Sequence, residues 1–295
     1  MKRKLESKTA YIVLQGLLYL AKRTRFKFLI SHEREKFAER MLQQTKIGRK
    51  CLKRVSGRFS NWEARIKESI FTPGITVHYA LRKNYIEEAT FQAIDSGVKQ
   101  IVNLGAGLDW LTYYVSEKHP EVSCIEVDHP STQKIKKQAL AESLARRPNL
   151  HFLSVNFEQQ NFKDALKNFE AFDPNKKTLF VSEGVLMYLG RSSVESIFNA
   201  IHTLTGTGTL FLFTSIEPKG SKRSNVRPLL FHYLTLIGEP IRWALASEDV
   251  DEFLAEQHCQ LERLMTAKEL RKKYILTPYD YTFHIGEYLV TGRFY

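Results

Sequence analysis

Two glycines, Gly105 and Gly107, stand where the sequence changes from a strand pattern to a helix pattern. Glycine reaches positive φ without a clash at Cβ, and it lets a ligand come against bare backbone. A ligand at such a turn also faces the free N–H groups and the positive end of the next helix, which favour an anionic group. The turn therefore predicts a binding site of the nucleotide type, while close packing at a strand-to-helix corner is the structural alternative.

An acidic residue follows at the distance that a ribose requires. Asp128 ends a second apolar run and lies 23 positions after Gly105. In nucleotide-binding folds a carboxylate about 20 residues after the first glycine holds the ribose hydroxyls. Trp110 occupies the position where a dinucleotide fold needs a small residue beneath the pyrophosphate. S-Adenosylmethionine has a ribose, a carboxylate and an ammonium group but no phosphate, so it fits these residues better.

Four further polar residues are candidates for ligand contact, and each has a structural alternative. Asp109 is either a partner for an ammonium group or the N-cap of the following helix. Arg82 is either a solvated charge on a helix or a guanidinium that clasps a carboxylate. Asn156 either pairs with an adenine edge or forms a turn. Glu183 ends an apolar run, where an acid is either a ligand contact or a costly burial.

The elements that position these residues alternate between strand and helix. Apolar runs predict seven strands, at 101–104, 122–128, 150–157, 178–183, 209–216, 260–266 and 281–295. Amphipathic patterns predict helices after Leu108 and at about 29–41, 75–96, 132–147, 193–204, 249–257 and 267–274. This alternation predicts an α/β fold with a mostly parallel seven-stranded sheet and helices on both faces.

Residues 217–247 interrupt the alternation with several prolines, glycines and aromatic residues. Aromatic insertions at the carboxyl edge of an α/β sheet often form a substrate pocket, so we expect a cap insertion here. Structural packing alone explains the same residues equally well.

The net charge of +12 belongs to the N-terminal segment. Residues 1–70 contain 19 Lys and Arg against 6 Asp and Glu, whereas the rest of the chain contains 25 against 26. An enzyme acting on nucleic acid more often carries positive charge around its cleft as well, so no nucleic-acid partner is expected. We expect a basic helical extension at 1–70 and a ligand-binding domain at 71–295.

Cysteine and histidine usage predicts neither disulfides nor a metal site. Cys51, Cys124 and Cys259 are far apart and odd in number, and the nine histidines show no paired ligand spacing. A reducing compartment, the cytoplasm, is therefore expected.

The N-terminal segment contains an apolar stretch, Ala10–Ala21, between basic clusters. Twelve residues are too few to span a bilayer, which needs about 20, and a secretory signal would need a cleavage site that is missing here. Two interpretations remain. The stretch is either a helix packed on the catalytic domain or part of a peripheral contact, through residues 1–30, with an anionic membrane.

Three motifs taken together resemble a known family. IVNLGAGLD at 101–109, IEVDHP at 125–130 and FVSEGVLMYL at 180–189 are similar to the leucine carboxyl methyltransferase family and its bacterial relatives, which are class I S-adenosylmethionine-dependent methyltransferases with a Rossmann-like sheet. The resemblance covers about residues 72–295. It implies a cofactor site in which each member has a distinct role: Arg82 at the methionine carboxylate, Gly105 and Gly107 at the turn, Asp128 at the ribose, Asn156 and Phe157 at the adenine, and Glu183 at the methionine end.

The sequence departs from the family pattern at two places. Asn156 stands where relatives usually have Asp, and Asp109-Trp110-Leu111 replaces the usual Asp-Thr-Arg. The first change keeps an acceptor oxygen for adenine, and the second indicates a different substrate pocket.

The resemblance implies methyl transfer to an oxygen, either a carboxylate or a hydroxyl of a small molecule or lipid-like acid. A carboxylate is already nucleophilic at neutral pH, so alignment and exclusion of water are sufficient and no catalytic residue is assigned. Two alternatives remain. One is a methyltransferase-fold protein that has lost catalysis and serves as a scaffold at a membrane surface. The other, less favoured because of Trp110, is a nicotinamide-dependent dehydrogenase.

Overall fold

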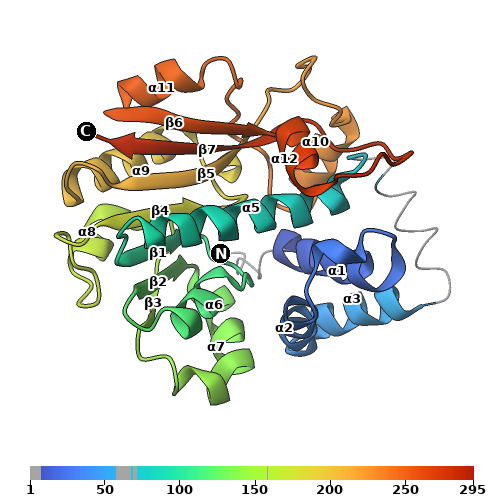
Figure 1. The fold of residues 1–295 in the computed structure, drawn as a ribbon, viewed down its shortest axis with the longest axis horizontal. Helices are drawn as coiled ribbons and strands as arrows, with labels where there is room; N and C mark the ends of the chain where they lie inside the picture. Colours follow the sequence, from blue (N-terminus) through green and yellow to red (C-terminus); the bar gives the residue numbers. More distant parts are fainter. Residues whose placement is uncertain (1–7, 58–67, 69–71, 158) are drawn as a thin grey trace.

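A computed structural model describes residues 8–57, 68, 72–157 and 159–295, and it shows an α/β sheet protein (Figure 1). Its seven strands lie in the order β3-β2-β1-β4-β5-β7-β6. The strand bounds are β1 Gln100–Leu104, β2 Ser123–Asp128, β3 Leu150–Ser154, β4 Thr178–Ser182, β5 Leu210–Ile216, β6 Cys259–Thr266 and β7 Glu287–Phe294. Strands β1 to β5 pair in parallel, and β7 is antiparallel to both β5 and β6. The predicted mostly parallel, seven-stranded sheet is confirmed.

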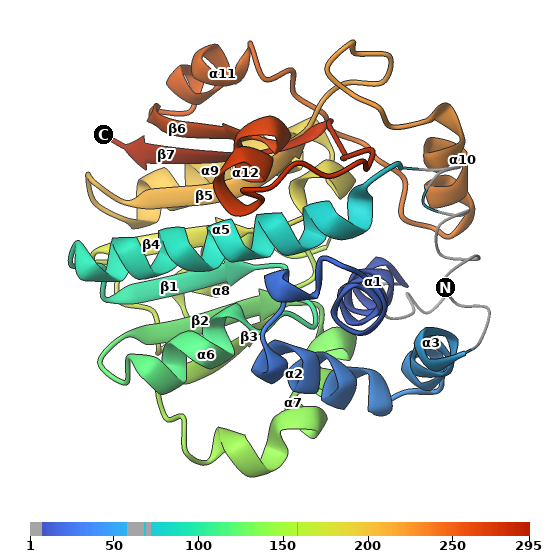
Figure 2. The ribbon, with the colours of Figure 1, turned by 45° about the vertical axis from the view of Figure 1, so that its right-hand side comes forward.

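Helices cover both faces of the sheet (Figures 1 and 2). On one face lie α5 (Ile75–Asp95), α6 (Leu111–Lys118), α7 (Pro130–Leu144) and α12 (Ala267–Tyr274). On the other lie α8 (Phe162–Lys167), α9 (Arg191–Leu204) and α11 (Val250–Glu256). The central strand β1 is buried on both sides, with Ile101 in one core and Val102 in the other. This two-sided burial explains why the strands read as continuous apolar runs instead of alternating patterns.

The N-terminal segment forms α1 (Lys8–Arg23), the 3₁₀ helix η1 (Lys27–Leu29), α2 (His32–Gln43) and α3 (Lys46–Ser56). Helix α1 contacts α2, α3 and α5, and both views place the group beside the ends of β1 and β2 (Figures 1 and 2). Its residues Leu14, Leu17 and Leu18 are at most 2% exposed. The apolar stretch therefore packs on the sheet domain, as the first interpretation expected. In the described part of the chain, no helix combines the length and apolar character needed to cross a membrane.

Some predicted bounds were wrong for local reasons. The helix after the glycine turn begins at Leu111, not directly after Leu108, because Ala106–Asp109 form a turn in which Asp109 N–H donates to Ala106 O at 3.0 Å. The last strand begins at Glu287 instead of residue 281. Ahead of it, Gly286 has φ 141° and Ile285 N–H donates to the side chain of Asn225, so these residues leave the sheet.

The cap segment 217–247 contains one helix, α10 (Pro228–Leu236), and it adds no strand to the sheet. Pro228 occupies the first turn of α10, where its missing N–H costs nothing.

The third predicted strand also ends early, at Ser154, so Asn156 and Phe157 lie in the loop that follows β3.

Candidate active site

A cavity of about 1170 Å³ lies where the parallel strands end. All seven residues predicted for the cofactor site line it: Arg82, Gly105, Gly107, Asp128, Asn156, Phe157 and Glu183. They come from five places in the fold, namely helix α5, the end of β2 and the loops after β1, β3 and β4. The structure thus brings together residues that are up to 101 positions apart in sequence.

The turn after β1 requires glycine. Gly105 has φ 68° and Gly107 has φ 52°, both in the left-handed region. A Cβ on Gly105 would lie 2.3 Å from Cγ2 of Val185, so a side chain does not fit there. At Gly107 the nearest atoms to such a Cβ are 3.8 Å or more away, and the backbone faces the cavity.

Asp128 is fixed beside this turn by the backbone. Its carboxylate accepts hydrogen bonds from the N–H groups of Gly107 and His129, each at 2.5 Å. Burial raises the pKa of the Asp128 carboxyl, and the two N–H donors oppose that effect. Each carboxylate oxygen has capacity for a further donor. The geometry therefore fits a pair of ribose hydroxyls at the end of β2.

The methionine end of the predicted site is a buried cluster of charges. Arg82 is 5% exposed, and its Nη1 lies 2.7 and 2.8 Å from the two carboxylate oxygens of Glu287. Its Nε and Nη2 lie 2.8 and 2.7 Å from Oε1 of Glu183. Burial would lower the pKa of Arg82, but the two carboxylates raise it above its ordinary value. The interpretation of Arg82 as a solvated surface charge is wrong.

Lys83 extends this cluster to Asp109. Its Nζ lies 2.6 Å from the Asp109 carboxylate and 3.0 Å from Glu183. Burial would raise the pKa of Asp109, but Lys83 outweighs it and holds the pKa below the ordinary range. The N-cap of α6 is Trp110, so the N-cap interpretation of Asp109 is wrong.

Among the described residues, the carboxylates of this cluster outnumber its Lys and Arg side chains by one. They are Asp109, Glu183 and Glu287, and they face Arg82 and Lys83. Such a cluster suits a ligand that carries positive charge, such as an ammonium group or a sulfonium. A ligand carboxylate at Arg82 would share the guanidinium with two carboxylates already bound.

Two histidines border the same cluster and were not predicted. His78 Nε2 lies 2.9 Å from Glu287, and the ring of His284 lies 4.7 Å from that of His78. Burial lowers the pKa of His284 to about 3, so the ring is neutral at physiological pH. Their ligand atoms and that of Glu287 lie within 4.8 Å of one another, close enough for a metal ion. However, Arg82 contacts both oxygens of Glu287, and this guanidinium opposes a second cation there.

The predicted adenine residues follow β3. The carbonyl of Asn156 accepts from the N–H groups of Gln159 and Gln160, so its backbone starts a turn. The Phe157 ring lies 5.7 Å from that of Phe162. Both side chains line the cavity, and the turn leaves the adenine interpretation of Asn156 open.

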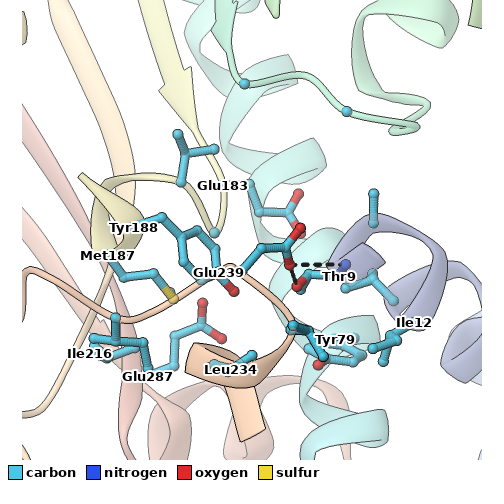
Figure 3. Close-up of a pocket in the computed structure, with 18 of the residues that line it drawn as sticks. Thr9, Ile12, Tyr79, Glu183, Met187, Tyr188, Ile216, Leu234, Glu239 and Glu287 are labelled. Atoms are coloured by element: carbon cyan, nitrogen blue, oxygen red, sulfur yellow. Dashed lines mark hydrogen bonds between the residues drawn. The ribbon is translucent and has the colours of Figure 1, made fainter. Parts of the chain in front are cut away.

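The other half of the cavity is apolar. Figure 3 shows Ile12 of α1, Met187, Ile216 and Leu234 of α10 around it, with the hydroxyl of Tyr188 among them. Burial raises the pKa of Tyr188 to about 12, so its phenol stays protonated. The cap segment therefore lines the cavity.

Helix α1 meets the cap at the edge of this apolar half. The N–H of Thr9 donates to Glu239 at 3.2 Å, and its hydroxyl also bonds that carboxylate (Figure 3). The first helix is therefore part of the cavity wall. Local sequence pattern does not indicate this contact, because the two residues are 230 positions apart.

Comparison with known proteins decides the family. The sequence model of the leucine carboxyl methyltransferases matches residues 9–202. The chain belongs to the leucine carboxyl methyltransferase family. The match begins within α1, so the family region includes the N-terminal helices, which the motif resemblance at 72–295 left out.

Relatives and a solved structure agree with this assignment. A Bacillus subtilis (strain 168) protein named "Putative S-adenosyl-L-methionine-dependent methyltransferase YktD" is 30% identical over 59% of this chain and 58% of its own. A Mycolicibacterium paratuberculosis protein with the same type of name is 29% identical over 49% and 48%. The chain spans about half the length of these curated relatives.

A crystal structure of a putative methyltransferase from Thermobifida fusca has a TM-score of 0.57 at 15% identity, and the match covers 86% of this chain and 93% of that one. At this identity the likeness shows the class I methyltransferase fold alone. The cofactor expected from the sequence, S-adenosylmethionine, is the one named for the curated relatives.

Proposed function

We propose that the protein is an S-adenosylmethionine-dependent methyltransferase that methylates an oxygen, carboxylate or hydroxyl, of a small and largely apolar acceptor. One observation carries the proposal. A single cavity joins the glycine turn and Asp128 to an apolar half formed by α1, the loop after β4 and the cap. A donor and an acceptor held in its two halves would be neighbours.

The residues around the first half fit the donor. The open backbone at Gly107 and the fixed carboxylate of Asp128 suit a nucleoside, and the acidic side of the buried cluster suits an ammonium group. S-Adenosylmethionine would supply the methyl group from its sulfonium. Asn156 and Phe157 would border the adenine.

The chain itself would contribute by aligning the donor with the acceptor and by excluding water from the cavity. The apolar walls exclude water, which leaves an acceptor oxygen less solvated and more nucleophilic. For a carboxylate acceptor, Arg54 is a candidate cation among the residues that line the cavity, because Arg82 and Lys83 are already paired with acids. Tyr188 offers a neutral hydroxyl that can donate to the acceptor.

A methyl-transfer assay tests the proposal. The purified protein is incubated with labelled S-adenosylmethionine and extracts of small acids and lipids, and mass spectrometry identifies what gains a methyl group. We expect Asp128→Ala to lose transfer, whereas Glu121→Ala, an exposed acid just before β2, keeps it. Cofactor binding without any methylated product would favour an inactive scaffold instead. Binding of a nicotinamide cofactor in place of S-adenosylmethionine would favour the dehydrogenase, which the buried Trp110 argues against.

The leucines of α1 that the peripheral contact through residues 1–30 would use are buried against α2, α3 and α5. Within this segment Phe28 is exposed, and residues 1–7 lie outside the described part of the chain, so the contact stays a prediction.

A further inference from the structure

We infer that the protein docks on an anionic lipid bilayer through the outer sides of α3 and α10. We define this mouth face by its exposed residues: Lys46, Arg49, Lys50, Lys53 and Arg54 on α3, and Lys222, Arg227, Leu229 and Leu236 on the cap. The inference does not depend on the methyl-transfer reaction, and its test measures binding alone.

The first observation is the apolar outer side of α10. Leu236 is 85% exposed and Leu229 is 49% exposed. The two lie seven positions apart, so they share one face of the helix. Single exposed leucines are common on protein surfaces. Here, however, they lie on a helix that also forms part of the cavity wall, through the 6% exposed Leu234 and through Leu236 itself.

The second observation is charge. Residues 218–238 contain four Lys and Arg and no acid, and α3 contains five and no acid. In the described part of the chain, no ion pair joins any of the five cations of α3 to an acid. In the cap, Arg223 is paired with Glu248. Among the described residues, α3 is therefore the segment whose cations have no acidic partner, and the cap adds Lys222 and Arg227 beside its exposed leucines.

The third observation is position. Both views place α3 and α10 on the same side of the molecule (Figures 1 and 2). Arg54 of α3 and Leu236 of α10 both line the rim of the same cavity. Docking through this face would turn the opening of the cavity toward lipid, so an apolar acceptor would enter without crossing water.

A bilayer explains the residue types better than other polyanions do. Nucleic acid would account for the cations but not for exposed leucines beside them. An acidic protein would cover both, and absence of binding to anionic vesicles is the outcome that favours it. Apolar insertion together with Lys and Arg is the combination that binds an anionic membrane surface.

The test is co-sedimentation of the full chain with vesicles. We expect binding to vesicles of equal parts phosphatidylglycerol and phosphatidylcholine, and little binding to phosphatidylcholine alone. Lys50→Glu/Lys53→Glu should weaken binding by about tenfold or more, because each cation near an anionic surface contributes favourably. Leu229→Ser/Leu236→Ser should weaken vesicle binding by a similar factor at high salt. Salt screens the attraction between the cations and the anionic lipid, so the apolar contribution is what remains there.

Matched controls lie at the other end of the molecule. Lys167→Glu/Lys176→Glu reverses two exposed lysines there, and Tyr295→Ser removes an exposed ring at the C-terminus. Both should bind vesicles as the wild type does, and thermal melts should show that every variant is folded. The inference is overturned if anionic vesicles are not bound or if the controls lose as much as the mouth-face variants. It is also overturned if the leucine variant binds unchanged, since binding would then be electrostatic alone and would not involve apolar insertion.

Discussion

Asp128 is held by two backbone N–H groups, so its carboxylate has its place before any ligand arrives. Replacement by alanine removes the acceptor for the ribose hydroxyls. A hydrogen bond to a charged group contributes about 1.5–3 kcal/mol. We therefore expect Asp128→Ala to weaken S-adenosylmethionine binding by at least about tenfold, measured by calorimetry. Glu121→Ala should bind normally, and an unchanged affinity in Asp128→Ala would defeat the ribose assignment.

The neutral ring of His284 makes stability depend on pH. Its pKa is lowered by burial from 6.5 to about 3, and His78, Arg82 and Glu287 surround it. The unfolded chain therefore binds one more proton than the native state between these values. The contribution of His284 to the free energy of unfolding is fully present above pH 6.5. It is lost as the pH decreases below that value, by about 1.4 kcal/mol per pH unit.

Urea unfolding in the upper half of that window checks the sign. We expect His284→Gln to lose stability less steeply than the wild type as the pH falls. His32→Gln, whose side chain is 74% exposed, should keep the wild-type slope. Equal slopes in all three proteins would mean that His284 is protonated in the native state.

The turn between β1 and α6 is the element on which the proposed site depends most. Gly105→Ala puts a Cβ 2.3 Å from Val185 at a positive φ, and both effects act against the native turn. We expect a loss of about 1–3 kcal/mol of stability from the backbone alone, together with loss of cofactor binding. Gly206→Ala is the matched control, because nothing lies within 4 Å of its added methyl group. Wild-type binding by Gly105→Ala would show that the turn is not the cofactor cradle.

The strand and helix order was predictable because it depends on local pattern. The inner parallel strands β1, β2, β4 and β5 are buried on both faces, which produces apolar runs, and the glycines after β1 mark the turn directly. The exact ends were less predictable. The start of β7 is set by a bond between Ile285 and Asn225, which lies 60 positions earlier.

The partners in the buried ion pairs were not predictable from local pattern. Arg82 is buried because Glu183 and Glu287 lie beside it, and these are 101 and 205 positions away. One signal did exist. Glu287 is an acid at the beginning of an apolar run, just as Glu183 is an acid at the end of one, and such a position predicts either a ligand contact or a costly burial. The same signal marks Glu126 within β2, which pairs with Lys136 of α7 at 2.7 Å.

At the scale of the whole molecule, the N-terminal helices and the sheet share one core. Leu18 of α1 belongs to the same buried cluster as Leu81 of α5 and Ile101 of β1. Thr9 joins α1 to the cap across the cavity. The basic segment at 1–70 is therefore not an appendage in its described part, and we expect the chain to unfold in a single transition.

Leu18→Ala tests this unity. The side chain is 0% exposed, so its truncation should cost about 2–5 kcal/mol, and the whole urea transition should shift without splitting. Leu276→Ala makes the same chemical change at a residue that is 88% exposed, and its cost should stay within about 0.5 kcal/mol. Fluorescence and circular dichroism should give the same midpoint. If Leu18→Ala instead produced an early partial transition while the sheet remained folded, the N-terminal helices would be a separate unit. The cavity would then lose the wall that α1 supplies without loss of the fold.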